Sequence, residues 1–200
     1  AKELKPPYNE KHERIRIWAN GRWEYFQPRV RFGPGVYMAH QLAELWPDDT
    51  IGIIKVASGG TGIRGFEKNW SKEWADRTFD GKKGSLYKDL MNAVAEAKRI
   101  SKPEFCGFVW KQGGGDKGRK EIANNYYDTF KQLVSDLRKD VKTLDMPVFV
   151  FNVLIDEELD KRDPEEFARK WKYLMPILKA KNRAGRDIPN AVTVLHGTDL

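Results

Sequence analysis

Hydrophobic residues follow two different spacings along this chain, and the change between them outlines its predicted elements. Short apolar runs of strand length occur at 14–18, 51–57, 105–110, 146–154 and 191–195. The first run alternates apolar and polar residues, as a half-exposed edge strand does. Three of the others, 51–57, 105–110 and 146–154, are nearly continuous, which is typical of strands covered on both faces. The pattern therefore predicts a sheet of five strands, most of them buried.

Between these runs, apolar residues recur at spacings of three and four, which indicates amphipathic helices. The predicted helices run over residues 36–46, 86–97, 122–141 and 167–178. Pro176 lies inside the last of them and is expected to kink or divide it. Strands that alternate with helices predict βαβ units and a parallel sheet, so we expect an α/β fold. We see no internal repeat and expect a single domain over residues 1–200.

Two of the continuous strands run into glycines. The segment "IIKVASGGTG" (53–62) contains Gly59 and Gly60, and "FVWKQGGGD" (108–116) contains three glycines after Gln112. Ligands of parallel α/β sheets bind beyond the carboxyl ends of the strands. Glycine lets backbone N–H groups approach a ligand, and such groups stabilise the oxyanion of acyl transfer. The residues leave a second interpretation open, in which these glycines only form tight turns. The long segment 62–83 is expected to form a functional loop.

Neither glycine segment fits a phosphate-binding motif. The first lacks the Lys-Ser/Thr ending of a P-loop, and the second is not GxGxxG. Ser58 is disfavoured as a nucleophile because Val56 stands where G-x-S-x-G needs its first glycine. His12, His40 and His196 lack metal-ligand spacing and are interpreted as structural or loop residues. No metal or organic cofactor is expected.

Charge and cysteine content narrow the possible partners. The 200 residues carry a net charge of +7, but basic residues alternate with acids, as in "EKNWSKEWADR". This mixture is typical of solvated surfaces, so a nucleic-acid partner is not expected. No apolar run approaches the ~20 residues of a membrane span, so no membrane partner is expected either. The single cysteine, Cys106, excludes an intrachain disulfide and is expected to be buried in its strand.

Five segments together resemble a known family in their order and spacing. They are "NGRWEY" (20–25), "GPGVYMAHQLAELWP" (33–47), "IGIIKVASGGTGI" (51–63), "GFVWKQGGGD" (107–116) and "YYDTFKQLVSDLRKD" (126–140). In them the chain resembles the sialate O-acetylesterase and acetylxylan esterase (carbohydrate esterase family 6) group of SGNH hydrolases. The resemblance covers residues 14 to 155 and continues more weakly to the end.

This resemblance implies a three-layer α/β/α sandwich with a mostly parallel, flavodoxin-like sheet. It implies a serine esterase that removes acetyl groups from an acetylated carbohydrate without a cofactor. Gly59, Gly60 and Gln112 would form the oxyanion hole, and Thr61 and Asp116 would bind substrate. Members of the family are often secreted or periplasmic, which is the expected localisation here.

The sequence departs from the family pattern in three places. Gly114 stands where the family block W-x-Q-G-E-x-D has glutamate. The G-Q-S-N block of the nucleophile and the D-x-x-H block of the Asp/His pair do not occur in this sequence. In the strand order 2-1-3-4-5, the missing first strand would lie between 14–18 and 51–57. Backbone groups at such a gap need partners, so we expect flanking sequence or a partner segment to fill it.

Three functions remain open from the sequence. A carbohydrate O-acetylesterase is favoured. A catalytically inactive carbohydrate-binding domain on the same fold is the alternative, and it predicts sugar binding without turnover. The third is a basic adaptor for polyanions, whose affinity should fall steeply with salt.

Overall fold

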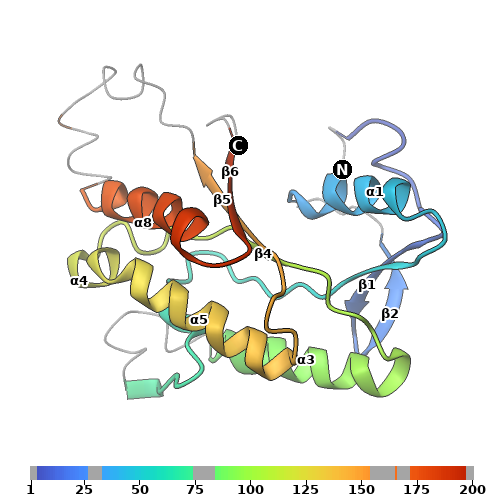
Figure 1. The fold of residues 1–200 in the computed structure, drawn as a ribbon, viewed down its shortest axis with the longest axis horizontal. Coiled ribbons are helices and arrows are strands. Elements are labelled where there is room, and N and C mark those ends of the chain that lie inside the picture. The colour runs from blue at the N-terminus through green and yellow to red at the C-terminus, as the bar shows by residue number, and fades with distance from the viewer. Residues whose placement is uncertain (1–3, 27–32, 74–83, 154–164, 166–171, 197–200) are drawn as a thin grey trace. The chain divides into compact units, whose positions relative to one another are not determined.

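The computed structural model describes residues 4–26, 33–73, 84–153, 165 and 172–196 (Figure 1). Its strands form two three-stranded sheets, in the orders β2-β1-β3 and β4-β5-β6. The chain divides into two compact units, one of residues 1–57 with 89–103 and one of residues 58–88 with 104–200. Helices alternate with strands that pair mostly in parallel, which confirms the predicted α/β class. A single domain over residues 1–200 stays a prediction.

The sheet of the first unit closes without a gap. It consists of β1 (Ile15–Ala19), β2 (Arg22–Tyr25) and β3 (Ile51–Ile53). β1 pairs in parallel with β3, with Ile15 opposite Ile51. The expectation that a missing strand separates these two segments is therefore wrong for this structure. The direct ladder supplies the backbone partners that a gap between them would have left unmet.

The strand β2 was not predicted, although the sequence carries a signal for it. Asn20 and Gly21 join β1 to β2 and have φ angles of 53° and 71°. Two successive positive φ angles are the mark of a type I′ hairpin, for which Asn-Gly is the preferred pair. The dipeptide between two short strands was therefore sufficient evidence for an antiparallel hairpin.

The helix α1 (Gly35–Leu45) covers the first sheet. Ala39 and Ala43 are fully buried and pack with Ile15 and Ile51. The guanidinium group of Arg14 donates hydrogen bonds to the carbonyl oxygens of Ala43 at 2.7 Å, Trp46 at 2.9 Å and Asp49 at 3.1 Å. The bond to Ala43 satisfies a carbonyl group in the last turn of α1, and the other two bonds tie Arg14 to the loop that follows the helix.

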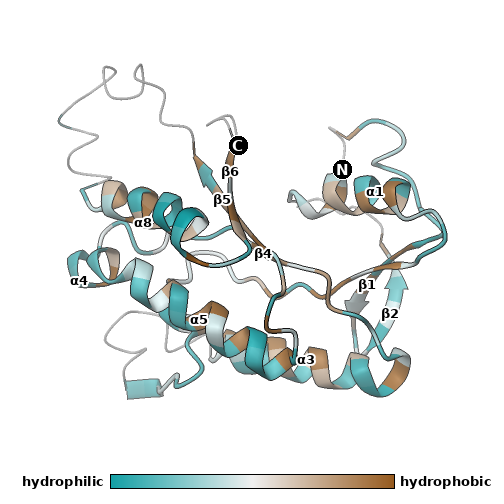
Figure 2. Ribbon diagram, viewed as in Figure 1, coloured by the Kyte–Doolittle hydropathy of each residue, from teal (hydrophilic) through white to brown (hydrophobic). Residues whose placement is uncertain are grey.

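The second unit contains a wholly parallel sheet whose strands are predominantly hydrophobic (Figure 2). Its strands are β4 (Phe108–Trp110), β5 (Val148–Val153) and β6 (Ala191–His196). β4 is shorter than the predicted strand 105–110. Cys106 consequently lies before the strand and is exposed, so the expected burial of its thiol is wrong.

The helices of the second unit differ from the predictions at their ends. They are α4 (Lys120–Asn124), α5 (Tyr126–Val141) and α8 (Leu174–Asp187), and α3 (Leu86–Ser101) begins in this unit. The helix predicted over 122–141 is divided between α4 and α5 at Asn125. Pro176 falls in the first turn of α8, where its missing N–H costs no helical hydrogen bond. Residues 167–171 of the predicted helix 167–178 lie outside the described residues.

α8 packs directly on β6. Gly185 faces Thr193 so closely that a Cβ atom at this position would overlap it, and Thr193 Oγ1 donates a hydrogen bond to the Lys181 carbonyl at 3.0 Å.

The predicted loop 62–83 begins with the short 3-10 helix η1 (Ile63–Phe66), and residues 74–83 lie outside the described residues. η1 directly follows the first glycine-rich loop, and α8 lies against the second loop at Gly113.

Candidate active site

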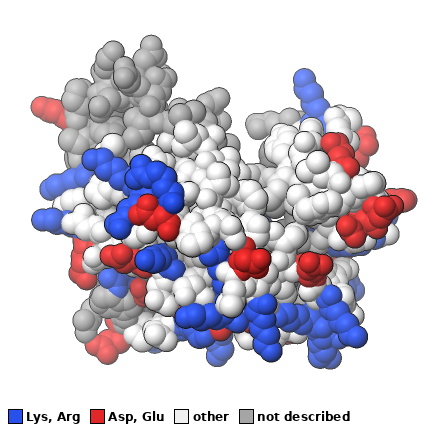
Figure 3. Space-filling view, in the orientation of Figure 1, with Lys and Arg blue, Asp and Glu red and all other residues white. Residues whose placement is uncertain are grey.

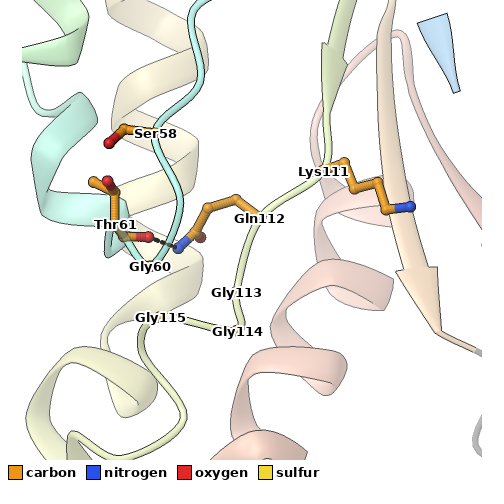
Figure 4. A pocket seen from close by; sticks show the side chains of 8 residues that line it. All are labelled: Ser58, Gly60, Thr61, Lys111, Gln112, Gly113, Gly114 and Gly115. Atoms are coloured by element: carbon orange, nitrogen blue, oxygen red, sulfur yellow. Dashed lines mark hydrogen bonds between the residues drawn. The ribbon is translucent and has the colours of Figure 1, made fainter. Parts of the chain in front are cut away.

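The two glycine-rich loops meet in the second unit and form a pocket of about 270 Å³ (Figure 4). The pocket is lined by Ser58, Gly60, Thr61, Lys111, Gln112, Gly113, Gly114 and Gly115. In Figure 4, Gln112 points toward Thr61, whereas Lys111 points away from that loop. We call this cavity the glycine pocket. The structure therefore brings together the two junctions that the sequence singled out.

Hydrogen bonds and a close backbone approach hold the two loops together. Gln112 Nε2 donates to the Thr61 carbonyl oxygen at 2.9 Å, and the Ile63 N–H donates to Asp116 Oδ2 at 2.9 Å. A Cβ atom on Gly115 would lie only 2.6 Å from the Thr61 carbonyl oxygen, which no side chain permits. This glycine is therefore required for contact between the loops, beyond any need for a turn.

A buried chain of hydrogen bonds fixes the orientation of the Gln112 amide. Trp110 Nε1 donates to the Tyr126 hydroxyl at 3.0 Å, and that hydroxyl donates to Gln112 Oε1 at 2.7 Å. Gln112 Nε2 then donates to Asp116 Oδ2 at 2.7 Å. Tyr126 and Asp116 are fully buried, and burial raises the pKa of Tyr126, which keeps its phenol protonated as a donor. The side-chain oxygen of Gln112 must therefore face Tyr126, and its nitrogen must face the loops.

The predicted oxyanion residues occupy different places around the pocket. Both amide hydrogens of Gln112 point at protein acceptors, so an oxyanion could take one of them only by displacing Thr61 O or Asp116. Gly60 lines the pocket, and Gly59 is not among its lining residues. Within the described residues, the backbone N–H groups of Gly60 and Gly114 donate no hydrogen bond. The oxyanion hole stays a prediction, and Gly60 is its best-placed member.

The predicted substrate-binding residues also differ in exposure. Thr61 lines the pocket, whereas Asp116 is fully buried and does not. Asp116 instead accepts hydrogen bonds from the Ile63 N–H and from Gln112, which makes it a support for both loops. A direct contact of either residue with substrate stays a prediction.

A buried lysine that the sequence analysis missed lies beside the second loop. A Cβ atom on Gly113 would lie 3.3 Å from Lys181 Nζ, which donates to the Phe151 carbonyl at 3.1 Å. Burial first, and then the charge of Lys111, lower the pKa of Lys181 to about 8, while Asp116 acts in the opposite direction. The signal was present, because Lys181 follows the buried Ile177 by four residues and so lies on the apolar face of its helix.

Gly114 has no steric reason to be glycine. A Cβ atom there would meet nothing within 4 Å, and its backbone does not require a positive φ. A Cβ atom therefore fits at the position where the family block carries glutamate. The glycine here leaves this side of the pocket open and without a carboxylate.

Ser58 has no hydrogen-bonded base among the described residues. Ser58 lines the pocket, yet within the described part of the chain its hydroxyl makes no hydrogen bond to a histidine or carboxylate. His40 belongs to the other unit, where its ring lies 5.1 Å from that of Tyr8 and 5.3 Å from that of His12. Burial and the charge of His12 lower the pKa of His40. These contacts fit the structural role predicted for His40.

Residues 4–26, 33–73, 84–153, 165 and 172–196 contain no group of His, Cys, Asp and Glu that could hold a metal ion. No helix among the same residues is long and apolar enough to cross a membrane.

Comparison with known proteins identifies the family. Residues 4–195 match the model of the family described as carbohydrate esterase, sialic acid-specific acetylesterase. The chain belongs to this family. The match covers both glycine loops and almost the whole chain, in agreement with the resemblance drawn from the five sequence segments.

Individual relatives agree with this assignment. The chain is 26% identical over 147 residues to a probable carbohydrate esterase of Arabidopsis thaliana, which covers 67% of the chain and 50% of the relative. The chain thus spans about half the length of that curated relative.

Three solved structures share the fold. A crystal structure of the Arabidopsis thaliana protein matches with a TM-score of 0.72 and 20% identity, over 96% of this chain and 72% of the other. The structure of NanS matches with a TM-score of 0.62 and 16% identity, over 97% and 72%. A carbohydrate acetylesterase from Xanthomonas citri matches with a TM-score of 0.61 and 14% identity, over 94% and 44%. The predicted three-layer α/β/α class is therefore confirmed.

Proposed function

We propose that this protein is a carbohydrate O-acetylesterase that removes acetyl groups from sugars by serine-type acyl transfer. One observation carries the proposal: in a chain of this esterase family, two glycine loops meet in a pocket lined by backbone N–H groups and a fixed glutamine. Such donors suit the negative charge that develops on an ester carbonyl oxygen. An acetylated carbohydrate is the proposed substrate, and no metal or organic cofactor is part of the proposal.

In the proposed reaction, a serine oxygen attacks the acetyl carbonyl carbon while a histidine accepts its proton and an aspartate orients the histidine. The tetrahedral intermediate then breaks its bond to the sugar oxygen, which takes the proton from the histidine, and water releases acetate from the serine in the same way. The family resemblance implies these three groups, and the G-Q-S-N and D-x-x-H blocks that carry them in the family do not occur in this sequence. The Gly60 N–H would bind the tetrahedral oxyanion. Gln112 would join it by exchanging its bond to the Thr61 carbonyl for one to the oxyanion. Tyr126 and Asp116 would hold the amide during this exchange, since they bind its other atoms.

A second candidate function is a carbohydrate-binding domain without catalysis. Two observations favour it: both amide hydrogens of Gln112 are taken by protein acceptors, and Gly114 lacks the carboxylate found in the family block. Such a domain would bind sugar in the same pocket without releasing acetate.

Release of acetate from O-acetylated N-acetylneuraminate and from acetylated xylo-oligosaccharides tests the proposal. We expect turnover by the protein purified from its source cells, and one serine adduct after treatment with a fluorophosphonate, read as an increase in intact mass. Gln112→Ala should lower kcat by about 10²–10³-fold if its amide stabilises the oxyanion. Gly114→Ala is the matched control, because a Cβ there meets nothing within 4 Å.

The outcomes separate the two candidates. Sugar binding without acetate release and without an adduct would support the binding domain and exclude the esterase. Absence of both binding and turnover would overturn both proposals. Equal kcat for Gln112→Ala and the unmodified protein would remove Gln112 from the oxyanion hole while leaving the esterase in place.

A secreted or periplasmic location is proposed together with this function. Its support is the resemblance to a family whose members are often exported. Immunodetection in fractions of the source cells checks it, and recovery from the cytoplasmic fraction would contradict it.

A further inference from the structure

A second pocket of the same unit lies between α8 and the pair formed by α4 and α5. Its volume is about 430 Å³, which is within the range of small-molecule sites in proteins. Its polar lining residues are Asn124, Tyr127, Lys179, Asn182, Arg183 and Arg186. None of them lines the glycine pocket. We call this cavity the basic pocket.

Three cationic side chains line the basic pocket from one face of α8. Lys179, Arg183 and Arg186 are spaced by four and three residues, which places them on neighbouring turns. Figure 3 shows Lys and Arg side chains gathered over this helix. Among the described residues, Asp187 is the acid that forms a salt bridge with this group, through Arg183. Lys179 and Arg186 form no salt bridge in the described part of the chain. The pocket therefore carries an excess of positive charge.

Two contacts restrain the exposed side chain of Arg183. Its guanidinium carbon lies 3.7 Å from the centre of the Tyr127 ring, and its Nε donates to Asp187 Oδ2 at 2.8 Å. Stacking and the ion pair together restrict the plane of the guanidinium. Its two terminal nitrogens have no acceptor in the described part of the chain. A planar, oriented pair of donors is the arrangement that binds a carboxylate by two parallel hydrogen bonds.

Asparagine amides complete the polar lining of the pocket. Asn152 is fully buried and donates from its Nδ2 to Asn182 Oδ1 at 2.8 Å. This bond fixes which end of the Asn182 amide faces the protein, so the Nδ2 group of Asn182 stays available to a ligand. Asn124 is exposed at the pocket and offers both a donor and an acceptor. Amides of this kind suit the hydroxyl groups of a sugar, which both donate and accept hydrogen bonds.

We propose that the basic pocket binds a carboxylate-bearing sugar unit of a glycan. Arg183 would bind the carboxylate, Lys179 and Arg186 would add charge, and the two asparagine amides would bind sugar hydroxyls. The choice of a sugar acid over other carboxylates rests on the proposed function, because the glycine pocket would act on an acetylated carbohydrate. The basic pocket would then hold the glycan through a unit different from the one that carries the acetyl group.

An NMR titration with N-acetylneuraminate and with its methyl ester tests this inference. The two probes differ in the carboxylate charge and share the rest of the sugar. We expect the acid to shift the side-chain amide signals of Asn124 and Asn182 and the Nε signal of Arg183. The ester should shift them by much less. Equal shifts with both probes would overturn the proposal, because recognition would not depend on the carboxylate.

Substitutions of Arg183 sharpen the test. Arg183→Gln should weaken binding of the acid by about tenfold or more, since it removes a charge-assisted pair of bonds. Arg183→Lys keeps the charge but loses the planar pair of donors, so it should also weaken binding. Lys131→Gln is the control, because Lys131 is an exposed residue of α5 outside the pocket and its loss lowers the net charge equally. Equal affinity for Arg183→Gln and Lys131→Gln would overturn the proposal.

Other results separate this inference from the proposed function. Shifts at residues 58–61 and 111–115 with none at the basic pocket would refute the inference and leave the esterase intact. Shifts at the basic pocket with no acetate release would support the inference and count against the esterase. Tighter binding of a DNA oligonucleotide or of inorganic phosphate than of the sugar acid would identify a general anion site and refute the inference.

Discussion

The glycine pocket and the basic pocket lie in the same unit but are built from different parts of the chain. Two loops form the glycine pocket, and its residues are held by buried side chains such as Tyr126 and Asp116. Exposed side chains on one face of α8 provide the charge of the basic pocket. Packing and buried hydrogen bonds therefore determine the first site. The second depends on charges that water already solvates.

This difference predicts how each site tolerates substitution. A change in the glycine pocket should disturb both loops, because the Gln112–Thr61 hydrogen bond joins residues that are 51 positions apart in sequence. A change in the basic pocket should affect binding and leave the fold intact, since exposed ion pairs contribute little to stability.

The largest expected effect is that of Gly115→Ala. Its Cβ atom would lie 2.6 Å from the Thr61 carbonyl oxygen, so the two loops would have to separate. We expect a loss of about 3 kcal/mol in the free energy of unfolding, measured by urea denaturation. Gly114→Ala is the matched neighbour and should be close to neutral, because a Cβ there meets nothing within 4 Å. Equal stability of the two variants would show that the loops are not in contact.

Asp116→Asn should come next. The buried carboxylate accepts hydrogen bonds from the Ile63 N–H and from Gln112, and an asparagine replaces its charge with an amide of similar shape. We expect a loss of about 2–3 kcal/mol in the free energy of unfolding, with a shift of the Ile63 amide signal in NMR spectra. Asp48→Asn is the control, as Asp48 is exposed and undergoes the same change of charge. An unmoved Ile63 signal would contradict the assigned contact.

Lys181 predicts a pH dependence for the glycine pocket. Its folded pKa of about 8 lies below the ordinary value of 10.5 for lysine. Between about pH 8 and pH 10, the unfolded chain holds a proton that the folded protein has released, so the free energy of unfolding should rise with pH. The size of this rise is on the order of 2 kcal/mol.

Lys181→Met should abolish that rise and leave a flatter profile of stability against pH from 7 to 10. Chemical denaturation at several pH values measures it. Lys179→Met reports the effect of removing an exposed lysine from the same helix. A rise of the same size in Lys181→Met and in the unmodified protein would assign the titration to another group.

The smallest expected effect is that of Asp187→Asn, at the residue that pairs with Arg183 of the basic pocket. Hydrogen bonding to Arg183 lowers the pKa of Asp187, but both side chains are exposed and their ion pair is solvated. We expect no measurable change in the denaturation midpoint. The Nε signal of Arg183 should nevertheless shift, because its acceptor has changed. A clear loss of stability would show that the basic pocket, like the glycine pocket, contributes to the stability of the fold.

Much of the fold and part of the site followed from local sequence patterns. Residues 148–153 form a strand within the predicted run 146–154, and α1 spans residues 35–45 against a prediction of 36–46. The hairpin strand β2 was missed, although Asn20-Gly21 marks it. The expected gap beside β1 was wrong because strand neighbours depend on long-range pairing, which a single sequence does not display.

The contacts within the glycine pocket could not be predicted from the sequence. Tyr126 lies within the predicted helix 122–141, and nothing local showed that its hydroxyl bonds to Gln112. Lys181 lies far from Gly113 along the chain, and only folding brings its amine beside the second glycine-rich loop. The basic pocket was missed for a related reason. Its charge comes from one helix, but Tyr127 on another helix orients Arg183.

By itself, the sequence determined which segments are strands or helices and where glycine gives the backbone freedom to form a site. These properties depend on side-chain spacing and on the conformational range of single residues, so a short segment carries them. Only the tertiary structure decided that Gly115 packs against Thr61, that Gln112 is held between Tyr126 and Asp116, and that Tyr127 and Asn124 close a pocket against the cations of α8. Hydrogen bonds and burial depend on distances between remote residues, and those distances exist only once the chain has folded.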